Sequence, residues 1–329
     1  TIEEAIKDGN VLGFHVDYIN TGEFTSYEDL REQIIERQKI EHPDLSDREL
    51  ERSVQILSDL QVEQQAAEDG VLVYQDETHI PRVVTEILDN WENQSQLKQF
   101  NGILTVAYKS RVIAYYREFK KQLESRNKQI NVAMTFSFGN ENDPDNVAPE
   151  IINEMFADYE AFTGLHFEAG NQKQGGDAYF EDLTERAKRG GSGRNSKNID
   201  LVIVADQLLT GYDSKRLNTL YVDRSLELQG LIQAYSRTNR VFGAGKEFGT
   251  IINFQYPKIT ENTVDTALKL YGSGGTSNKA IVDVYKNAVK KLELSVKQMK
   301  PTLPDPTDWQ KLKDDEAGKA NFQANFKAT

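Results

Sequence analysis

The clearest strand in the sequence is Ile199-Asp200-Leu201-Val202-Ile203-Val204-Ala205, and this stretch decides the fold. It is apolar on both faces, as expected for a strand inside a parallel sheet that helices cover on both sides. Short runs rich in β-branched and aromatic residues favour strands. Further strands are therefore expected before and after this stretch in the sequence, at residues 103–108, 132–136, 219–222 and 250–254.

Helical patterns separate these strands. After Pro149, apolar residues recur every three or four positions, and helices are also expected at about 110–125, 177–189 and 226–239. This alternation of strands and helices implies an α/β domain, with a parallel sheet flanked by helices. We place the domain at residues 92–258.

Segments of a different character flank this domain. Residues 1–91 are more charged and less regular, with a strand expected at 14–18 and a polar helical pair at 28–66. A helix with Pro81 in its first turn should end this leading segment, because proline is well tolerated there. Residues 259–329 are expected to form a helical C-terminal segment.

A polar turn, Gln207-Leu208-Leu209-Thr210-Gly211-Tyr212-Asp213, directly follows the 199–205 strand. In open parallel sheets, ligands bind beyond the carboxyl ends of the strands. Gly211 would let the backbone approach a phosphate, and Asp213 could accept from a ribose hydroxyl or hold a metal-bound water. A local turn capped by Asp213 explains the same residues when the motif stands alone.

A second cluster is Gln233-Ala234-Tyr235-Ser236-Arg237-Thr238-Asn239-Arg240. On a helix, Gln233, Arg237 and Arg240 would share one face. Two guanidinium groups on one face can clamp an anion, because arginine forms charge-assisted and often bidentate bonds to phosphate. The open alternative is a solvated basic face at the end of a helix, where arginine suits the helix dipole.

Together the two clusters resemble motifs V and VI of superfamily 2 helicases and translocases. The resemblance implies a RecA-like fold of the P-loop NTPase kind, in the position of the second helicase domain. It implies that Gly211 and Asp213 contact the nucleotide, with Gln233 as a supporting contact. It also implies that Arg237 and Arg240 reach the γ-phosphate as the catalytic residues.

The residues of these motifs are similar to those of one family in particular, the R subunit (HsdR) of type I restriction enzymes. The similarity covers about residues 199–254 most strongly and lies in three runs: Leu208-Leu209-Thr210-Gly211-Tyr212-Asp213-Ser214, Leu217-Asn218-Thr219-Leu220-Tyr221-Val222-Asp223 and Leu231-Ile232-Gln233-Ala234-Tyr235-Ser236-Arg237-Thr238-Asn239-Arg240. It implies half of an ATP-driven translocase of double-stranded DNA, within a site-specific restriction endonuclease. The methylation and specificity subunits would be its partners.

The same resemblance suggests DNA contacts. Lys109, Ser110 and Arg111 stand at motif IV, just after the first strand of the domain, where they could bind backbone phosphate. Thr210 is a comparable candidate, because motif V links the nucleotide site to the DNA strand in this family. Lysines and arginines just after a strand are equally often ordinary solvent-facing residues.

Composition narrows the function classes. Cysteine is absent, which excludes disulfides, thiol catalysis and cysteine-ligated zinc and fits a reducing cytoplasm. The four histidines are scattered, so no metal site is expected. A net charge of −13 argues against nucleic-acid binding over the whole surface. The chain has neither an apolar span nor a signal peptide, and it lacks an initiator Met, so we expect it to be trimmed from a longer polypeptide.

The chain has no G-x-x-x-x-G-K-[ST] phosphate loop; Gly243-Ala244-Gly245-Lys246 resembles only its tail. ATP and Mg²⁺ should therefore be bound mainly by a first motor domain that is missing here, and the chain alone should be inactive. The alternative hypothesis is a non-catalytic docking module of a multisubunit DNA-processing complex. A docking module would have no need of the arginine face beside a Gly-Tyr-Asp turn.

Overall fold

The computed structural model describes residues 5–6, 8–137, 147–168, 172–189, 197–243 and 245–271, with the short pieces 296–297 and 318–319. Contacts divide the chain into two units, Thr1–Ile281 and Val282–Thr329. The sheet and its helices belong to the first unit. Most of the expected C-terminal segment 259–329 lies outside the described residues.

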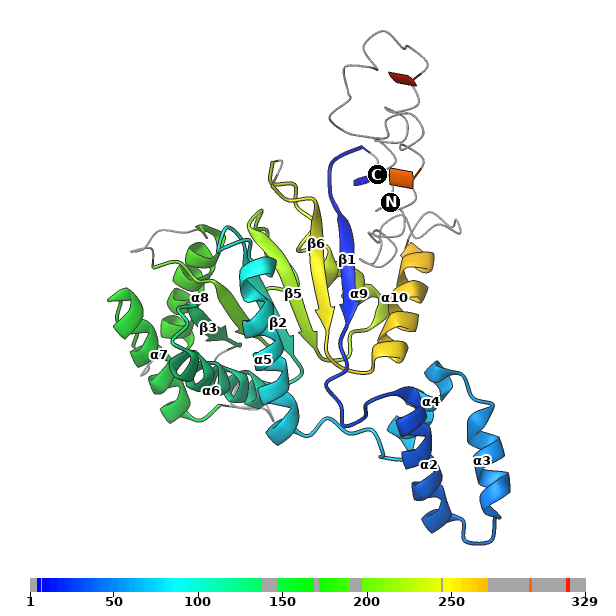
Figure 1. The fold of residues 1–329 in the computed structure, drawn as a ribbon. Coiled ribbons are helices and arrows are strands. Elements are labelled where there is room, and N and C mark those ends of the chain that lie inside the picture. The colour runs from blue at the N-terminus through cyan, green and yellow to red at the C-terminus, as the bar shows by residue number, and fades with distance from the viewer. Residues whose placement is uncertain are drawn as a thin grey trace. The chain divides into compact units, whose positions relative to one another are not determined.

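The first unit is built on six strands in one sheet (Figure 1). The order is β1-β6-β5-β2-β4-β3, and every pair is parallel, which confirms the predicted α/β class. The strands are β1 (Gly13–Tyr18), β2 (Asn101–Val106), β3 (Val132–Thr135), β4 (Leu201–Val204), β5 (Leu217–Asp223) and β6 (Phe248–Asn253).

Helices lie on both faces of this sheet; in Figure 1, α5 passes in front of the strands and α9 lies behind β1. Among the described residues, no helix is long and apolar enough to cross a membrane. The helices are α2 (Tyr27–Glu41), α3 (Asp47–Gln55), α4 (Asp59–Glu68), α5 (Asp76–Gln94), α6 (Lys109–Arg126), α7 (Pro149–Thr163), α8 (Gln172–Arg189), α9 (Leu228–Tyr235) and α10 (Pro257–Tyr271).

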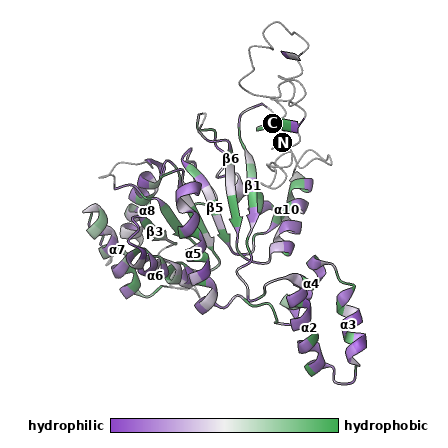
Figure 2. Ribbon diagram, in the orientation of Figure 1, coloured by the Kyte–Doolittle hydropathy of each residue, from purple (hydrophilic) through white to green (hydrophobic). Residues whose placement is uncertain are grey.

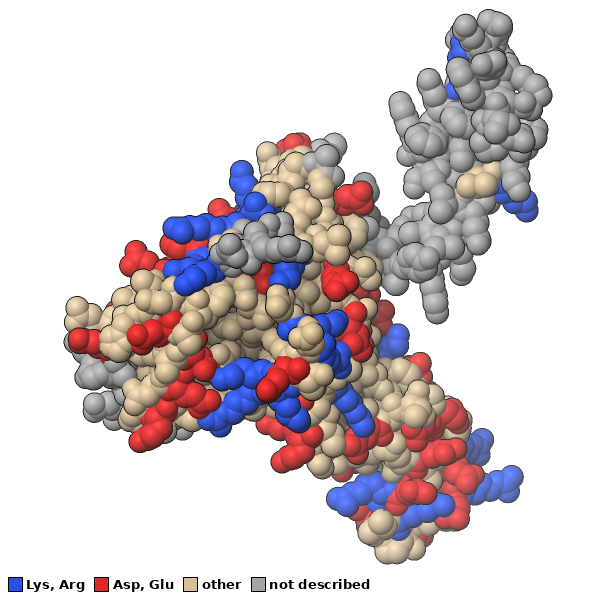
Figure 3. All heavy atoms as spheres, turned by 60° about the vertical axis from the view of Figure 1, so that its left-hand side comes forward, with Lys and Arg blue, Asp and Glu red and all other residues tan. Residues whose placement is uncertain are grey.

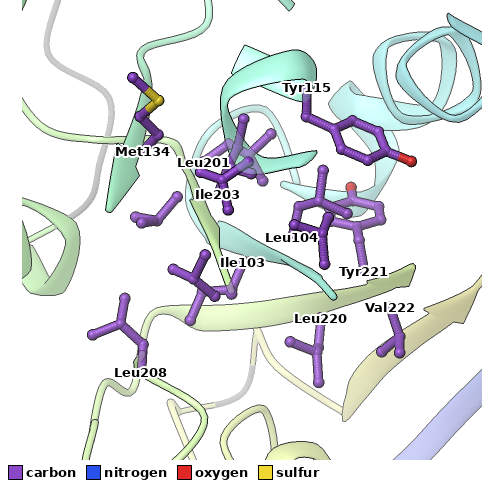
Figure 4. Close-up of a cluster of buried hydrophobic side chains, with 14 of the residues drawn as sticks. Ile103, Leu104, Tyr115, Met134, Leu201, Ile203, Leu208, Leu220, Tyr221 and Val222 are labelled. Atoms are coloured by element: carbon purple, nitrogen blue, oxygen red, sulfur yellow. The ribbon is translucent and has the colours of Figure 1, made fainter. Parts of the chain in front are cut away.

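The main core lies against β2, β4 and β5, whose side chains are buried throughout. Ile103 of β2, Ile203 of β4 and Leu220 of β5 belong to its centre, where Tyr115 and Met134 also contribute (Figure 4). Figure 2 shows hydrophobic stretches in the sheet, as in β3, and mostly hydrophilic outer faces on helices such as α6. Burial of this apolar surface is the main term that favours folding.

The leading segment 1–91 is not a separate layer. Its strand β1 pairs with β6 over six residues, so the segment predicted to precede the domain supplies an edge strand of the sheet. The polar pair predicted at 28–66 is three helices, α2 to α4, with a small apolar core of their own. The division at residues 92 and 258 stays a prediction.

Pro81 does not lie in the first turn of its helix. Helix α5 begins at Asp76, five residues before the proline, so this expectation was wrong. The early start follows from His79, which is buried in the first turns of α5 with its Nε2 2.6 Å from Asp223 Oδ1 at the end of β5. This contact holds the start of the helix against the sheet. Because Pro81 then lies inside the helix and has no backbone N–H, the helix lacks one backbone hydrogen bond.

Asp223 is a fully buried carboxylate on which several elements converge. Besides His79 it accepts hydrogen bonds from Arg111 Nη2 at 2.9 Å, from Gln255 Nε2 at 2.8 Å and from the Tyr115 hydroxyl. Burial alone would raise the pKa of Asp223, but the hydrogen bond and charge of His79, with the charge of Arg111, hold it below the ordinary value. The carboxylate therefore ties α5, α6 and Gln255, two residues after β6, to the end of β5.

We expect Asp223→Ala to lower the free energy of unfolding by about 3–5 kcal/mol, because His79 and Arg111 would lose the buried carboxylate that pairs with them. The control is Asp206→Ala, which removes an exposed partner of Arg224 and should cost no more than about 1 kcal/mol. Urea unfolding of both variants measures the difference.

The pH dependence tests the same carboxylate. Because the pKa of Asp223 is depressed by folding, its stabilising contribution is present above the unfolded-state pKa, about 3.9, and is lost as the pH falls through the folded-state value. The stability gap between the wild type and Asp223→Ala should be constant at neutral pH and shrink below about pH 4. An equal gap at all pH values would contradict this role.

Candidate functional site

The predicted nucleotide residues gather at one edge of the sheet, but not at the expected one. We call the edge at which the strands begin the amino-terminal edge. Leu12, just before β1, donates its backbone N–H to Asn239 O at 2.8 Å, and the Lys188 ammonium, at the end of α8, lies 5.9 Å from the centre of the Tyr212 ring. Both contacts place residues 212 and 239 at the amino-terminal edge, whereas the 207–213 turn was predicted at the carboxyl edge.

The route of the chain explains the difference. Gln207 does lie at the carboxyl edge, where its Oε1 accepts from Thr135 Oγ1 at the end of β3. The chain then returns across the sheet to begin β5 beside β2, turning at Leu208 and Gly211, which have φ values of 66° and 72°. Glycine adopts this left-handed conformation without the steric cost that other residues carry.

Asp213 and Arg240 form the exposed part of the site. The Arg240 Nε donates to Asp213 Oδ1 at 2.7 Å, and the side chains of Arg240 and Asp213 are 32% and 71% exposed, respectively. Arg240 Nη1 also donates to Asn239 Oδ1 at 3.2 Å. An ion pair this exposed is worth about 0–1 kcal/mol, so a ligand with more negative charge could displace Asp213.

Arg237 lies beside this pair and is held by the backbone. Its Nη1 donates to Tyr212 O at 2.9 Å and its Nε to Gln233 O at 3.2 Å. Burial lowers the pKa of Arg237, and so does the charge of Arg240, although arginine stays protonated at neutral pH. Two guanidinium groups with one exposed carboxylate between them leave local positive charge that an anion would neutralise.

The two arginines do not stand on a helix. Helix α9 ends at Tyr235, so the predicted shared face with Gln233 at 226–239 was wrong. The helix ends because Thr238 turns inward: its Oγ1 donates to Tyr235 O at 2.9 Å, and it packs against Gly249 of β6. A Cβ at Gly249 would lie 2.2 Å from Thr238 Oγ1, so only glycine allows this approach. The Gln233 side chain is exposed on α9.

The predicted DNA residues lie elsewhere. Lys109 to Arg111 begin α6 at the carboxyl edge, where Lys109 is buried and Ser110 is exposed. Arg111 is 13% exposed and paired with Asp223 and, at 3.2 Å, with Asp76, which gives it structural partners. Thr210 is exposed in the crossing between the two edges.

Lys246 belongs to the site, although sequence reasoning set its Gly243–Lys246 segment aside. Its Nζ donates to Leu217 O at 2.7 Å and to Lys215 O at 3.3 Å, and the side chain is buried. Burial, together with the charge of Arg240, lowers the pKa of Lys246 to about 7. The sequence shows a lysine shortly after the arginine motif, but no local pattern indicates which backbone carbonyl groups it contacts.

Among the described residues, no group of three or more Asp, Glu or His side chains is placed to hold a metal ion. What this part of the chain offers at the site is a set of donors to an anion.

The comparisons with known proteins identify the family. The family model described as type I restriction enzyme subunit R domain 3 matches residues 98–256. The chain is 30% identical over 328 residues to the endonuclease subunit of a type I restriction enzyme from Staphylococcus aureus strain COL, covering 98% of this chain and 31% of that protein. It is 31% identical over 329 residues to such a subunit from Staphylococcus saprophyticus, with the same coverage.

A solved structure of a putative HsdR fragment from Vibrio vulnificus YJ016 aligns with 79% of this chain and 35% of its own, at 13% identity and a TM-score of 0.41. The chain spans about a third of the length of the curated relatives that it matches. By the sequence matches, the chain belongs to the R-subunit family of type I restriction enzymes.

Proposed function

We propose that this chain is the second motor domain of an ATP-dependent DNA translocase within a type I restriction endonuclease. Arg237 and Arg240 would stabilise negative charge on the γ-phosphate of an ATP that another domain of the subunit binds. The observation that carries the proposal is their convergence with Gly211 and Asp213 at one exposed edge, with a surplus of positive charge.

The site's residues fit an incoming triphosphate. Two backbone carbonyl groups already orient the Arg237 side chain. It would therefore lose little conformational entropy when it binds a phosphate. Arg240 is held by one exposed carboxylate, which a phosphate can replace. Asp213, once released, could accept from the ribose, and Gly211 leaves space for the backbone to approach. Mg²⁺ would be held mainly by the domain that carries the phosphate loop, a motif that this sequence lacks.

DNA would be bound along the carboxyl edge and the crossing between the edges. Ser110 and Thr210 are exposed there, whereas Arg111 would have to exchange its partner Asp76 for a phosphate. The net charge of −13 is no obstacle, because residues 27–70 hold 13 carboxylates against five Lys and Arg side chains and so account for −8 of it. In the view of Figure 3, which brings the left-hand side of Figure 1 forward, Lys and Arg side chains form several separate patches among Asp and Glu.

The second candidate function is docking of the methylation and specificity subunits. The acidic helices α2 to α4 favour it, since they carry most of the negative charge and a core separate from the sheet. The two functions are compatible, because docking would use these helices and the motor would use the amino-terminal edge.

In the full-length subunit, Arg237→Ala or Arg240→Ala should abolish ATP-driven translocation without unfolding the protein. An arginine that contacts the γ-phosphate is typically worth about 10³–10⁵ in turnover, which corresponds to roughly 4–7 kcal/mol. Steady-state ATP hydrolysis and triplex displacement measure the loss, and thermal unfolding checks the fold. Arg→Lys should also be badly impaired, because lysine lacks the planar fork.

The matched control for these variants is Arg117→Ala, which removes an exposed arginine paired with Glu154 on α7. It should change stability by no more than about 0.5 kcal/mol and leave hydrolysis intact. If both site variants hydrolyse ATP and translocate at near wild-type rates, the motor function is wrong and docking takes its place.

The isolated chain should show no DNA-stimulated ATP hydrolysis, because it offers a nucleotide only half a site. Phosphate release with and without duplex DNA tests this expectation. Turnover that survives repurification and disappears in Arg240→Ala would contradict it.

Binding of the isolated chain to duplex DNA should be weak, independent of sequence and strongly dependent on salt, because only local patches of positive charge can contact the phosphates. Fluorescence anisotropy at several salt concentrations measures it. Sequence-specific binding with a submicromolar Kd at physiological salt would contradict this expectation.

A further inference from the structure

Lys246 is a buried cation without a carboxylate partner among the described residues. It is 3% exposed, and its ammonium meets two backbone carbonyl groups and lies 5.9 Å from the centre of the Phe100 ring. A buried charge costs stability unless it is paired. An apolar side chain of similar length would avoid this cost, so the lysine needs another explanation.

The partners of Lys246 show what it connects. Lys215 and Leu217 follow Asp213 on the way into β5, and Lys246 follows Arg240 on the way into β6. The two segments are thus joined twice: at the surface by the Asp213–Arg240 pair and in the interior by Lys246. We call them the aspartate segment (residues 213–217) and the arginine segment (residues 237–243 with 245–246).

The two connections differ in what happens when a ligand arrives. The surface pair is exposed and has to open when Arg240 turns to a phosphate. The bonds of Lys246 involve only backbone acceptors in the interior, so they stay formed. After the pair opens, Lys246 still fixes the arginine segment against the start of β5.

We propose that Lys246 is a positioning residue for Arg240, holding the arginine segment against the aspartate segment while Arg240 leaves Asp213 for the phosphate. The inference rests on the proposed function, since it assigns Lys246 a role in the same γ-phosphate site. Lys246 itself touches no ligand.

The charges around Lys246 predict that its pKa changes when a ligand binds. Arg240 is the charged neighbour that lowers the pKa of Lys246, and Glu247 is an exposed carboxylate next to Lys246 in the chain. Because the charge of Arg240 helps to lower the pKa of Lys246, a phosphate that neutralises Arg240 should raise it again. Nucleotide binding should then be accompanied by proton uptake slightly above neutral pH.

The first test is Lys246→Met in the full-length subunit, with Lys215→Met as the matched control, since the Lys215 side chain is exposed on the aspartate segment. Single-turnover ATP hydrolysis at saturating ATP should fall by about 10²-fold in Lys246→Met, because misplacing a catalytic group by about 1 Å costs that much. Lys215→Met should stay close to the wild type. A rate for Lys246→Met within about twofold of the wild type would overturn the proposal.

The second test separates positioning from plain stabilisation. Because Lys246 acts through Arg240, adding Lys246→Met to Arg240→Ala should cause no further loss of turnover. A lysine that only stabilised the fold would cost the same factor in both backgrounds, and that result would overturn the proposal.

The third measurement needs no variant of Lys246 and so stands even if Lys246→Met fails to fold. Calorimetric titration with ATP in two buffers of different ionisation heat, at about pH 7.5, should show proton uptake in the wild type and none in Arg240→Ala. Equal uptake in both proteins, or none in either, would overturn the proposal. The proposed function fails separately, if Arg240→Ala itself hydrolyses ATP at the wild-type rate.

Discussion

The whole arrangement depends on one constraint: every strand pair of the sheet is parallel, so each connection must return from the carboxyl edge to the amino-terminal edge. The connection from β4 to β5 makes this return without a helix and carries Asp213 with it. The connection from β5 to β6 returns through α9 and delivers Arg237 and Arg240. Because β5 and β6 are neighbours, these two returning segments end side by side, and the ion pair follows from the topology.

The two edges hold their charged groups in different ways. At the carboxyl edge, the buried Asp223 carboxylate binds Arg111, His79 and Gln255. The negative charge of Asp223 is therefore paired there and held in place. At the amino-terminal edge, Arg237 and Lys246 are held mostly by backbone carbonyl groups, which orient a cation without neutralising it. Full pairing stabilises a fold, whereas oriented and unneutralised cations are what an anion requires. The contrast favours the amino-terminal edge as the place where a nucleotide phosphate would bind.

Much of this could be predicted from local patterns. The strands at 103–108, 132–136, 199–205, 219–222 and 250–254 were found because their apolar runs are short and bounded, and the confirmed family and α/β class followed from the motifs beside them. The choice of edge was wrong because the rule for ligands at carboxyl ends assumes a turn that stays there, whereas residues 208–213 cross the sheet. The end of α9 depends on Gly249, and the partners of Lys246 lie about 30 residues away, so neither contact leaves a periodic signal in the sequence.

In the proposed function, the arginine pair favours the transition state of ATP hydrolysis over the bound nucleotide. The most direct measurement compares the affinity of the full-length subunit for ADP alone and for ADP with aluminium fluoride, which imitates the transferring phosphoryl group, in the wild type and in Arg240→Ala. We expect the variant to lose about 10²-fold or more in affinity for the aluminium fluoride complex while its affinity for ADP hardly changes. Equal affinities of the two proteins for both ligands would contradict it.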